Sequence, residues 1–374
     1  MGAKKIDLLR DAPSAAEAAD LTYVSITDPG YSRRGPKGRF FYVTPDGERV
    51  KDARELERIK KLGIPPAWTH VWICKMPDGH IQCVGRDVRG RKQYRYHTRW
   101  REVRDGAKYE DALAFGESLP QLRARITRDL VQTELTKDAV VAAALRVMDL
   151  THIRVGNDRY SQENHSYGLT TLLAKHTKVE GATVELDFKG KSGKQRHAAT
   201  HDEKLAKILR RCLAIPGQRL FRYRDAAGSY HAISSTDVNE YIHRATDKPF
   251  TAKEFRTWTA TVRAALLLFG AEPSVSATHG KRQVKEAIRQ VAQDLGNTLA
   301  ICKKSYVHPA IVEAYLGGSL HHHMKRGLRA ASKGPGIRKT ERAVLYFLRA
   351  HHRQAPNALE KSLERSLTKL KKSA

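Results

Sequence analysis

The sequence predicts an α+β protein, with a small hairpin-rich N-terminal domain followed by a mostly α-helical domain that carries one small β-hairpin sheet. Two Pro-Asp-Gly turns between β-type runs favour hairpins near the N-terminus. From residue 118 onward, apolar residues recur at helical spacing. We therefore expect a flexible lead-in at residues 1–21, an N-terminal domain at 22–100, a helical domain at 101–318 and a basic C-terminal extension at 319–374.

The N-terminal domain is predicted from two copies of one turn. Residues 39–50 contain two β-type runs joined by Pro-Asp-Gly, and residues 71–84 repeat the arrangement. Residues 53–62, between these hairpins, have the apolar spacing of a short helix. The first 21 residues are rich in Ala and Asp and lack a sustained period, which favours a flexible segment.

The helical domain is predicted from periodicity and caps. Helices are expected at 136–148, 203–213, 236–244, 252–269 and 280–295, and a strand pair at 183–188 and 195–199. Residues 200–203 have the pattern of a capping box, and Thr251 precedes a further helix. Residues 319–374 hold 14 Lys or Arg against three acidic residues, so we expect a basic appendage rather than core.

Composition narrows the function. The 374 residues carry 68 Lys and Arg against 40 Asp and Glu, a formal net charge of +28 that indicates a polyanionic partner. No run of eighteen apolar residues predicts a membrane span, and neither a secretory signal nor a myristoylation site is expected at the N-terminus. Four widely spaced cysteines favour a reducing compartment and therefore a cytoplasmic protein.

Several enzyme classes lack their motifs. The sequence has no P-loop, no dinucleotide-binding glycine motif after a strand and no H-E-x-x-H helix. His321, His322 and His323 are adjacent and do not share a helical face, which argues against a metal site. We expect neither a metal nor a cofactor.

A basic segment at residues 86–104 holds eight Lys or Arg residues against two acidic ones, with interleaved aromatics. One interpretation is a solvated connector. The other, which we favour, is a segment that follows a nucleic acid backbone, because its cations would release counterions from phosphates. The candidate DNA-binding residues here are Arg86, Arg89, Arg91, Lys92 and Tyr94.

Four further residues are ambiguous singly. Arg154 follows an apolar helix, and Lys191 lies in the turn of the predicted strand pair. Arg256 lies early in a helix, where a cation opposes the macrodipole unless an anion binds nearby. Tyr306 would ordinarily be a half-buried aromatic. None of these signals is specific alone.

Their order and spacing, however, resemble those of the type IB DNA topoisomerases, in the compact bacterial and poxvirus-like branch. The motifs that carry the resemblance are His152-Ile153-Arg154-Val155-Gly156-Asn157, Phe188-Lys189-Gly190-Lys191, Lys253-Glu254-Phe255-Arg256-Thr257 and Leu295-Gly296-Asn297-Thr298, with Tyr306 nine residues after Asn297. The resemblance covers about residues 22–318. One departure is Asn297, where poxvirus members have histidine; an amide donates a hydrogen bond to a phosphate oxygen but carries no charge.

The resemblance implies the fold and chemistry of that family, which shares its catalytic fold with tyrosine recombinases. Tyr306 would attack a phosphodiester, Arg154, Arg256 and Asn297 would hold the phosphate, and Lys191 would be the general acid. Further DNA-binding residues implied by the motifs are Tyr160, Lys175, His176 and Lys253. The expected partner is double-stranded DNA, clamped by a monomer in the nucleoid, with relaxation of supercoils independent of ATP and metal.

Two alternatives remain open from sequence. A tyrosine recombinase shares the nucleophile and arginines, but normally has H-x-x-R where this chain has Lys253 three residues before Arg256. A non-catalytic basic nucleic-acid-binding protein would explain the net charge of +28 but not the spaced motifs.

Overall fold

The computed structural model describes residues 11–158, 161–162, 165–330 and 336–354. The chain divides into two compact units. In the described part, the N-terminal unit comprises residues 11–110 and the helical unit comprises residues 111–354. The division falls inside a long helix, α4 (Thr98–Asp129), whereas the domain boundary predicted at 100/101 precedes most of that helix.

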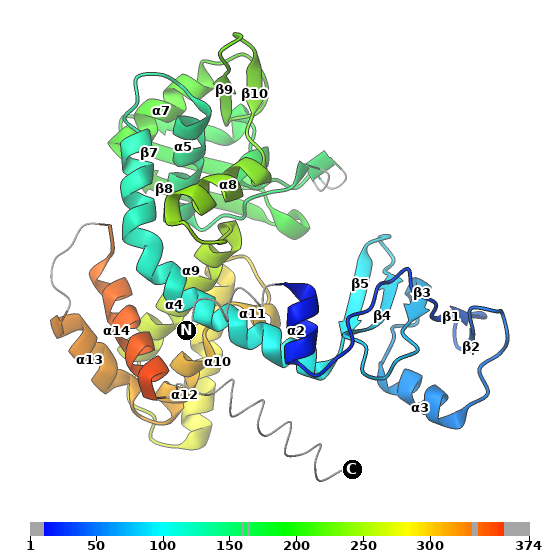
Figure 1. Ribbon diagram of the computed structural model, residues 1–374. Coiled ribbons are helices and arrows are strands. Elements are labelled where there is room, and N and C mark those ends of the chain that lie inside the picture. The colour runs from blue at the N-terminus through cyan, green and yellow to red at the C-terminus, as the bar shows by residue number, and fades with distance from the viewer. Residues whose placement is uncertain (1–10, 159–160, 163–164, 331–335, 355–374) are drawn as a thin grey trace. The chain divides into compact units, whose positions relative to one another are not determined.

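The N-terminal unit is built on a five-stranded antiparallel sheet in the order β2-β1-β3-β4-β5 (Figure 1). Its elements are β1 (Tyr31–Arg34), β2 (Phe41–Val43), α3 (Ala53–Lys61), β3 (Thr69–Ile73), β4 (Ile81–Arg86) and β5 (Lys92–Tyr96). Ile59 of α3 packs against Ile73 and Cys83, so one face of the sheet is covered by this helix.

The predicted second hairpin and the helix between the hairpins are confirmed, because β3 pairs with β4 and α3 begins at Ala53. The first hairpin is only partly right. β2 pairs chiefly with β1, and its predicted return is a single bridge between Val43 and Arg49. The pairing of β1 with β3 joins residues about forty positions apart, and no local pattern announces it.

The expectation of a flexible lead-in at residues 1–21 is wrong for residues 11–21; residues 1–10 lie outside the described residues. A helix, α2 (Ala12–Ala18), is capped by Asp11, whose carboxylate accepts a hydrogen bond from the Ser14 N–H at 3.0 Å. Ala15 and Ala16 are buried in a cluster with Trp100. Small side chains let a helix approach an aromatic ring closely, but alanines leave no strong hydrophobic period in the sequence.

The helical unit is organised around α5 (Lys137–Thr151), capped by Thr136 and buried along most of its length. A three-stranded sheet, β6 (Thr177–Glu180), β7 (Thr183–Lys189) and β8 (Gln195–His201), lies in the same unit. The other elements are η1 (Leu169–Thr171), η2 (Ala174–His176), η3 (Lys191–Gly193), α7 (Glu203–Leu213), β9 (Arg222–Arg224), β10 (Tyr230–Ala232), α8 (Ser235–Thr246), α9 (Ala252–Gly270), α10 (Ala277–Asp294), α11 (Leu299–Ser305), α12 (Pro309–Leu316), α13 (Leu320–Ala330) and α14 (Lys339–Gln354).

Most predicted elements of this unit are confirmed, including the strand pair and the helix behind Thr251, which forms a capping box with Glu254. The capping box predicted at residues 200–203 is wrong. Asp202 caps α7 by accepting from the Leu205 N–H at 3.0 Å, while Thr200 pairs within β8. The strand therefore continues into the segment that the pattern assigned to a cap.

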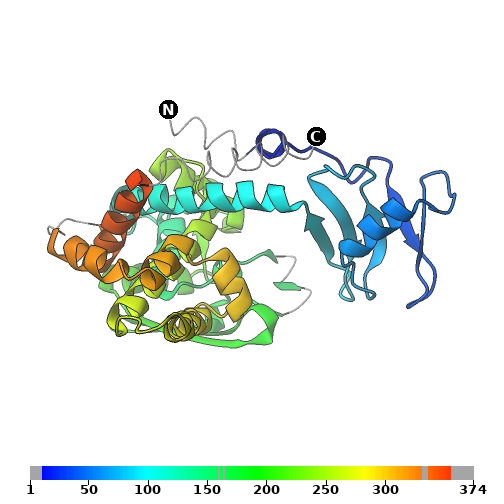
Figure 2. The same ribbon diagram turned by 90° about the horizontal axis from the view of Figure 1, so that it is seen from below.

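The described part of the predicted basic appendage is core. α13 and α14 lie side by side (Figure 2), and Leu320, Met324 and Phe347 belong to the main hydrophobic cluster. Buried ion pairs join Arg123 of α4 to Asp149 of α5 at 2.8 Å and to Glu341 of α14 at 2.7 Å. The high net charge of the segment concealed an apolar face, because its cations lie mainly on the opposite side of each helix.

Candidate active site

Arg154 follows the end of α5. The chain turns at His152, which caps α5 in the left-handed conformation with φ 58°. Arg154 donates from Nη2 to the carbonyl oxygen of Gly296 at 3.1 Å and to Oδ1 of Asn297 at 2.5 Å. The first arginine is therefore joined to the segment that follows α10.

Arg256 lies in the second turn of α9 and is only 5% exposed. It donates from Nη1 to the His152 carbonyl oxygen and from Nη2 to the Leu295 carbonyl oxygen, both at 2.7 Å, while its Nε is buried without a partner. Burial lowers the pKa of this guanidinium below its usual value, but arginine stays protonated at neutral pH. The two carbonyls orient the cation without neutralising it.

Asn297 stands directly after a helix end that requires glycine. Gly296 has φ +62°, and the Asn297 N–H donates back to the Ala292 carbonyl oxygen at 2.8 Å. The side-chain oxygen of Asn297 accepts from Arg154, whereas Nδ2 is buried without a partner. An unpaired buried donor beside two arginines is suited to an anionic oxygen.

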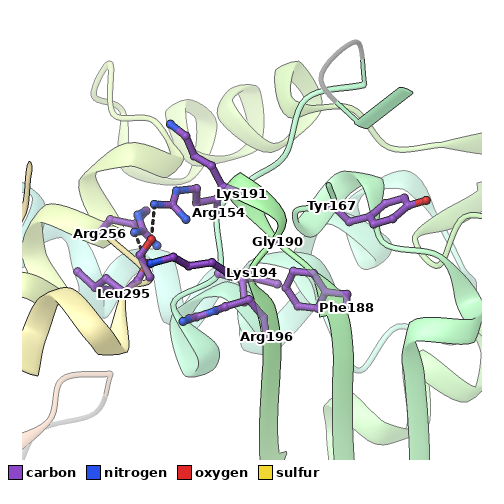
Figure 3. Close-up of a pocket in the computed structure, with 11 residues that line it drawn as sticks. Arg154, Tyr167, Phe188, Gly190, Lys191, Lys194, Arg196, Arg256 and Leu295 are labelled. Atoms are coloured by element: carbon purple, nitrogen blue, oxygen red, sulfur yellow. Dashed lines mark hydrogen bonds between the residues drawn. The ribbon is translucent and has the colours of Figure 1, made fainter. Parts of the chain in front are cut away.

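Lys191 opens the short turn between β7 and β8, and its side chain is exposed. This hairpin and the arginines line one pocket (Figure 3). The pocket residues are Ile153, Arg154, Tyr167, Phe188, Gly190, Lys191, Lys194, Arg196, Arg256, Leu295 and Gly296. Five are cations and none is a carboxylate, so the pocket favours an anion such as a phosphodiester.

Tyr306 is half-buried beside this pocket rather than in its lining. It follows α11, and its N–H donates to the Cys302 carbonyl oxygen at 3.0 Å. The guanidinium carbon of Arg256 lies 5.3 Å from the centre of its ring. The structure thus brings together all five residues that the resemblance singled out: Arg154, Lys191, Arg256, Asn297 and Tyr306.

His152 supports the pocket from behind. Its imidazole lies 3.3 Å from Oγ1 of Thr259, and its carbonyl oxygen receives Arg256. Burial, together with the nearby Arg338, Arg263 and Arg256, lowers its pKa to about 4, although Asp149 opposes the shift. The ring is therefore neutral at physiological pH.

Sequence reasoning missed Lys194 and Arg196 as pocket residues. Strand alternation could have found Arg196, which pairs with buried Phe188 and shares its face with Ala198, an inward position where a cation is unexpected. Lys194 has no comparable signal, because it lies in the turn.

The candidate DNA-binding residues of the N-terminal unit gather at the turn between β4 and β5. Arg86, Arg89 and Lys92 are exposed, whereas Arg91 forms an ion pair with Asp87 at 2.7 Å. Tyr94 is 39% exposed and stacks on Tyr96, with ring centres 5.7 Å apart. Their DNA contacts stay predictions.

The candidates in the helical unit differ in environment. Lys175 and Lys253 are exposed. His176 is half-buried: its Nδ1 accepts from the Leu173 N–H at 3.1 Å, and its ring meets Tyr167 edge-on at 4.6 Å. This placement gives His176 a role in shaping the loop. Tyr160 lies outside the described residues.

The described ranges bear on metal binding and on membrane insertion. Within those ranges, no group of three or more His, Cys, Asp or Glu side chains is arranged to hold a metal ion. No helix found there is both long and apolar enough to span a membrane.

Comparisons with known proteins decide the family. The family model described as eukaryotic DNA topoisomerase I, catalytic core, matches residues 97–331, and the one described as bacterial DNA topoisomerase IB, N-terminal domain, matches residues 39–87. A DNA topoisomerase 1B of Acanthamoeba polyphaga mimivirus is 31% identical over 293 residues, which cover 76% of this chain and 87% of the relative. The chain belongs to the type IB DNA topoisomerases.

More distant relatives of this topoisomerase agree. A monkeypox virus DNA topoisomerase I and a vaccinia virus (strain Copenhagen) DNA topoisomerase 1B are each 22% identical over 234 residues, covering 62% of this chain and 71% of theirs. A crystal structure of XerH site-specific recombinase bound to difH has a TM-score of 0.32 and 17% identity, over 51% of this chain and 49% of that one, too weak a likeness to carry an argument. The predicted family is confirmed, and the enzyme is an isomerase that acts on DNA topology.

Proposed function

We propose that this topoisomerase relaxes supercoiled duplex DNA by cutting one strand through Tyr306, allowing the free end to swivel, and resealing the strand. The supporting observation is the pocket of five cations with no lining carboxylate, next to a tyrosine whose ring lies 5.3 Å from the Arg256 guanidinium. Attack by the Tyr306 oxygen on phosphorus breaks the bond to the 5′-oxygen, leaving a 3′-phosphotyrosyl enzyme and a 5′-hydroxyl.

Arg154, Arg256 and Asn297 would stabilise charge on the non-bridging oxygens as it grows in the transition state. Arg256 keeps three N–H groups after its two carbonyl bonds, and Asn297 keeps its Nδ2 donor. These groups are already oriented before DNA binds, so little reorganisation is needed. Because Asn297 does not titrate, its contribution should not change with pH near neutrality.

Lys191 would protonate the departing 5′-oxygen, which is a poor leaving group as an anion. The exposed side chain sits at the tip of a two-strand hairpin, from which it can reach a bound backbone. In resealing, the same lysine would take the proton back as the 5′-oxygen attacks the phosphotyrosine.

The reaction needs neither ATP nor metal under this proposal. The phosphotyrosyl bond conserves the energy of the cut phosphodiester, and the arginines supply the positive charge that a metal ion provides elsewhere. We further propose that the enzyme is a cytoplasmic, nucleoid-associated monomer that clamps the duplex. Its phosphate contacts would include Arg86, Arg89, Lys92, Lys175 and Lys253.

The decisive experiment is relaxation of supercoiled plasmid in EDTA without ATP, comparing the parent enzyme with Tyr306→Phe. We expect the parent to relax both positive and negative supercoils, and the variant to lose relaxation and detergent-trapped covalent adduct while its affinity for duplex DNA stays within about twofold, since the substitution removes one hydroxyl. Adduct persisting in Tyr306→Phe would disprove the nucleophile, and a parent that relaxes plasmid only with added metal would disprove the metal-free mechanism.

A further inference from the structure

Arg196 occupies an unusual place between two glycines on different segments. A β-carbon built on Gly190, in the Lys191 hairpin, would lie 2.9 Å from Cγ of Arg196. A β-carbon built on Gly296, after α10, would lie 3.2 Å from Nη1 of the same side chain. The absence of side chains at both positions makes room for Arg196, whose stem lies along the hairpin and whose guanidinium reaches the end of α10.

The guanidinium is held there by the backbone. Nη2 donates to the Asp294 carbonyl oxygen at 2.9 Å, while the Asp294 carboxylate pairs with Arg263 instead. Arg196 is half-buried, and burial lowers the pKa of its guanidinium. Figure 3 shows Arg196 and Lys194 extending from the hairpin in the direction of Leu295 and Arg256.

The segment that Arg196 reaches continues directly into the residues that hold Arg154. Gly296 and Asn297 accept from Arg154, and Leu295 accepts from Arg256. Within the turn itself, the Gly190 N–H donates to the Lys194 carbonyl oxygen at 2.8 Å, and the Gly193 N–H donates to the Gly190 carbonyl oxygen at 3.1 Å. A bond from Arg196 to Asp294 thus connects the Lys191 turn to the frame of the phosphate-directed residues.

We propose that Arg196 is a positioning residue that fixes the Lys191 hairpin against the carboxyl end of α10, so that Lys191 faces the departing 5′-oxygen. The inference rests on the proposed general-acid role of Lys191. A competing role for Arg196 is direct contact with the phosphate. The two roles differ in one respect: a positioning residue acts through Lys191, whereas a phosphate ligand acts on the non-bridging oxygens.

The test compares Arg196→Ala, Lys191→Ala and the parent on ordinary DNA and on DNA with a 5′-bridging phosphorothiolate, whose sulfur leaves without a proton. Arg210→Ala is the matched control, since Arg210 also donates to one backbone carbonyl, that of Gly181, at the far end of the same sheet. On ordinary DNA, we expect the cleavage rate to fall by about a hundredfold or more in Lys191→Ala and by about tenfold in Arg196→Ala. Both variants should regain the parental rate on the phosphorothiolate.

Hydrogen exchange of the backbone amides at residues 190–194 supplies the independent readout. Exchange should be faster in Arg196→Ala and unchanged in Arg210→Ala. Equal impairment of Arg196→Ala on both substrates would make it a phosphate ligand, and parental cleavage or unchanged exchange would also overturn the positioning role. If Lys191→Ala alone fails to regain cleavage on the phosphorothiolate, the general-acid role of Lys191 is disproved. Hydrogen exchange then decides whether Arg196 holds the hairpin.

Discussion

The pocket of the helical unit and the β4–β5 turn of the N-terminal unit both gather cations, but they hold them differently. In the pocket, Arg154 and Arg256 donate to backbone carbonyls and to an amide oxygen. In the turn, the Asp87 carboxylate accepts from the backbone of Arg89 and pairs with the side chain of Arg91. Hydrogen bonds from these arginines hold the Asp87 pKa near 2.

The difference lies in the charge that remains. A carbonyl oxygen orients a guanidinium without cancelling its charge. A carboxylate orients the guanidinium and also neutralises its charge. The pocket therefore keeps a net positive field in a partly buried site, where electrostatic interactions are strong. The turn presents its cations to solvent, where salt screens them. We infer that the pocket orients its cations around one phosphate, whereas the turn provides positive charge that attracts the DNA backbone.

The largest effect should come from Arg256→Lys, which keeps the positive charge but loses the planar fork. A lysine has no second arm with which to contact both the His152 and Leu295 carbonyls, so its ammonium would be misplaced. We expect the single-turnover cleavage rate to fall by about a hundredfold to a thousandfold with little change in duplex affinity. A near-parental rate would show that charge alone suffices in the pocket.

An intermediate effect is expected on stability, through His152. Its pKa is about 4 in the folded protein against 6.5 ordinarily, so between these pH values the unfolded chain binds a proton that the folded protein does not. The free energy of unfolding should therefore fall as pH decreases from 7 to 4, with His152 contributing on the order of 2–3 kcal/mol. His152→Asn, which tolerates the left-handed backbone, should flatten this part of the profile.

Urea unfolding at several pH values measures that difference between the parent and His152→Asn. Subtraction removes the contribution of other titrating groups. Parallel plots of unfolding free energy against pH would mean that His152 is protonated as readily in the folded protein as in the unfolded chain. The imidazole would then be accessible to solvent in the folded state.

The smallest effect concerns the turn. Replacing Arg89 and Lys92 by alanine should reduce the slope of log affinity against log salt by about two, because each phosphate contact contributes about 0.9. Adding Arg91→Ala should flatten the slope less per residue, since Arg91 is already paired with Asp87. Filter binding over a salt series measures the slopes, with Lys204→Ala and Lys207→Ala on α7 as a control of equal charge. Equal flattening by the control would place the footprint elsewhere.

Local pattern predicted the elements whose determinants are near in sequence. The helix starts at Thr136 and behind Thr251, the β3–β4 turn and the β7–β8 pair all depend on residues within a few positions of one another, and all are confirmed. The predictions for residues 11–21 and for the described part of the C-terminal segment are wrong, because the burial of Ala15 against Trp100 and of Glu341 against Arg123 depends on distant partners. Amino-acid composition gives the residue types in a segment, but not which face of its helix is buried.

The same division applies to the site. Sequence alone determined the family, because its motifs can be recognised by residue type and spacing without knowing which residues are in contact. These motifs contain Arg154, Lys191, Arg256, Asn297 and Tyr306. Only the tertiary structure decided that Arg256 is held by two carbonyls from different segments, and that Arg196 passes between Gly190 and Gly296. The physical reason is that motifs record which chemical groups are present, whereas the orientation and desolvation that make those groups useful arise from residues far apart in the chain.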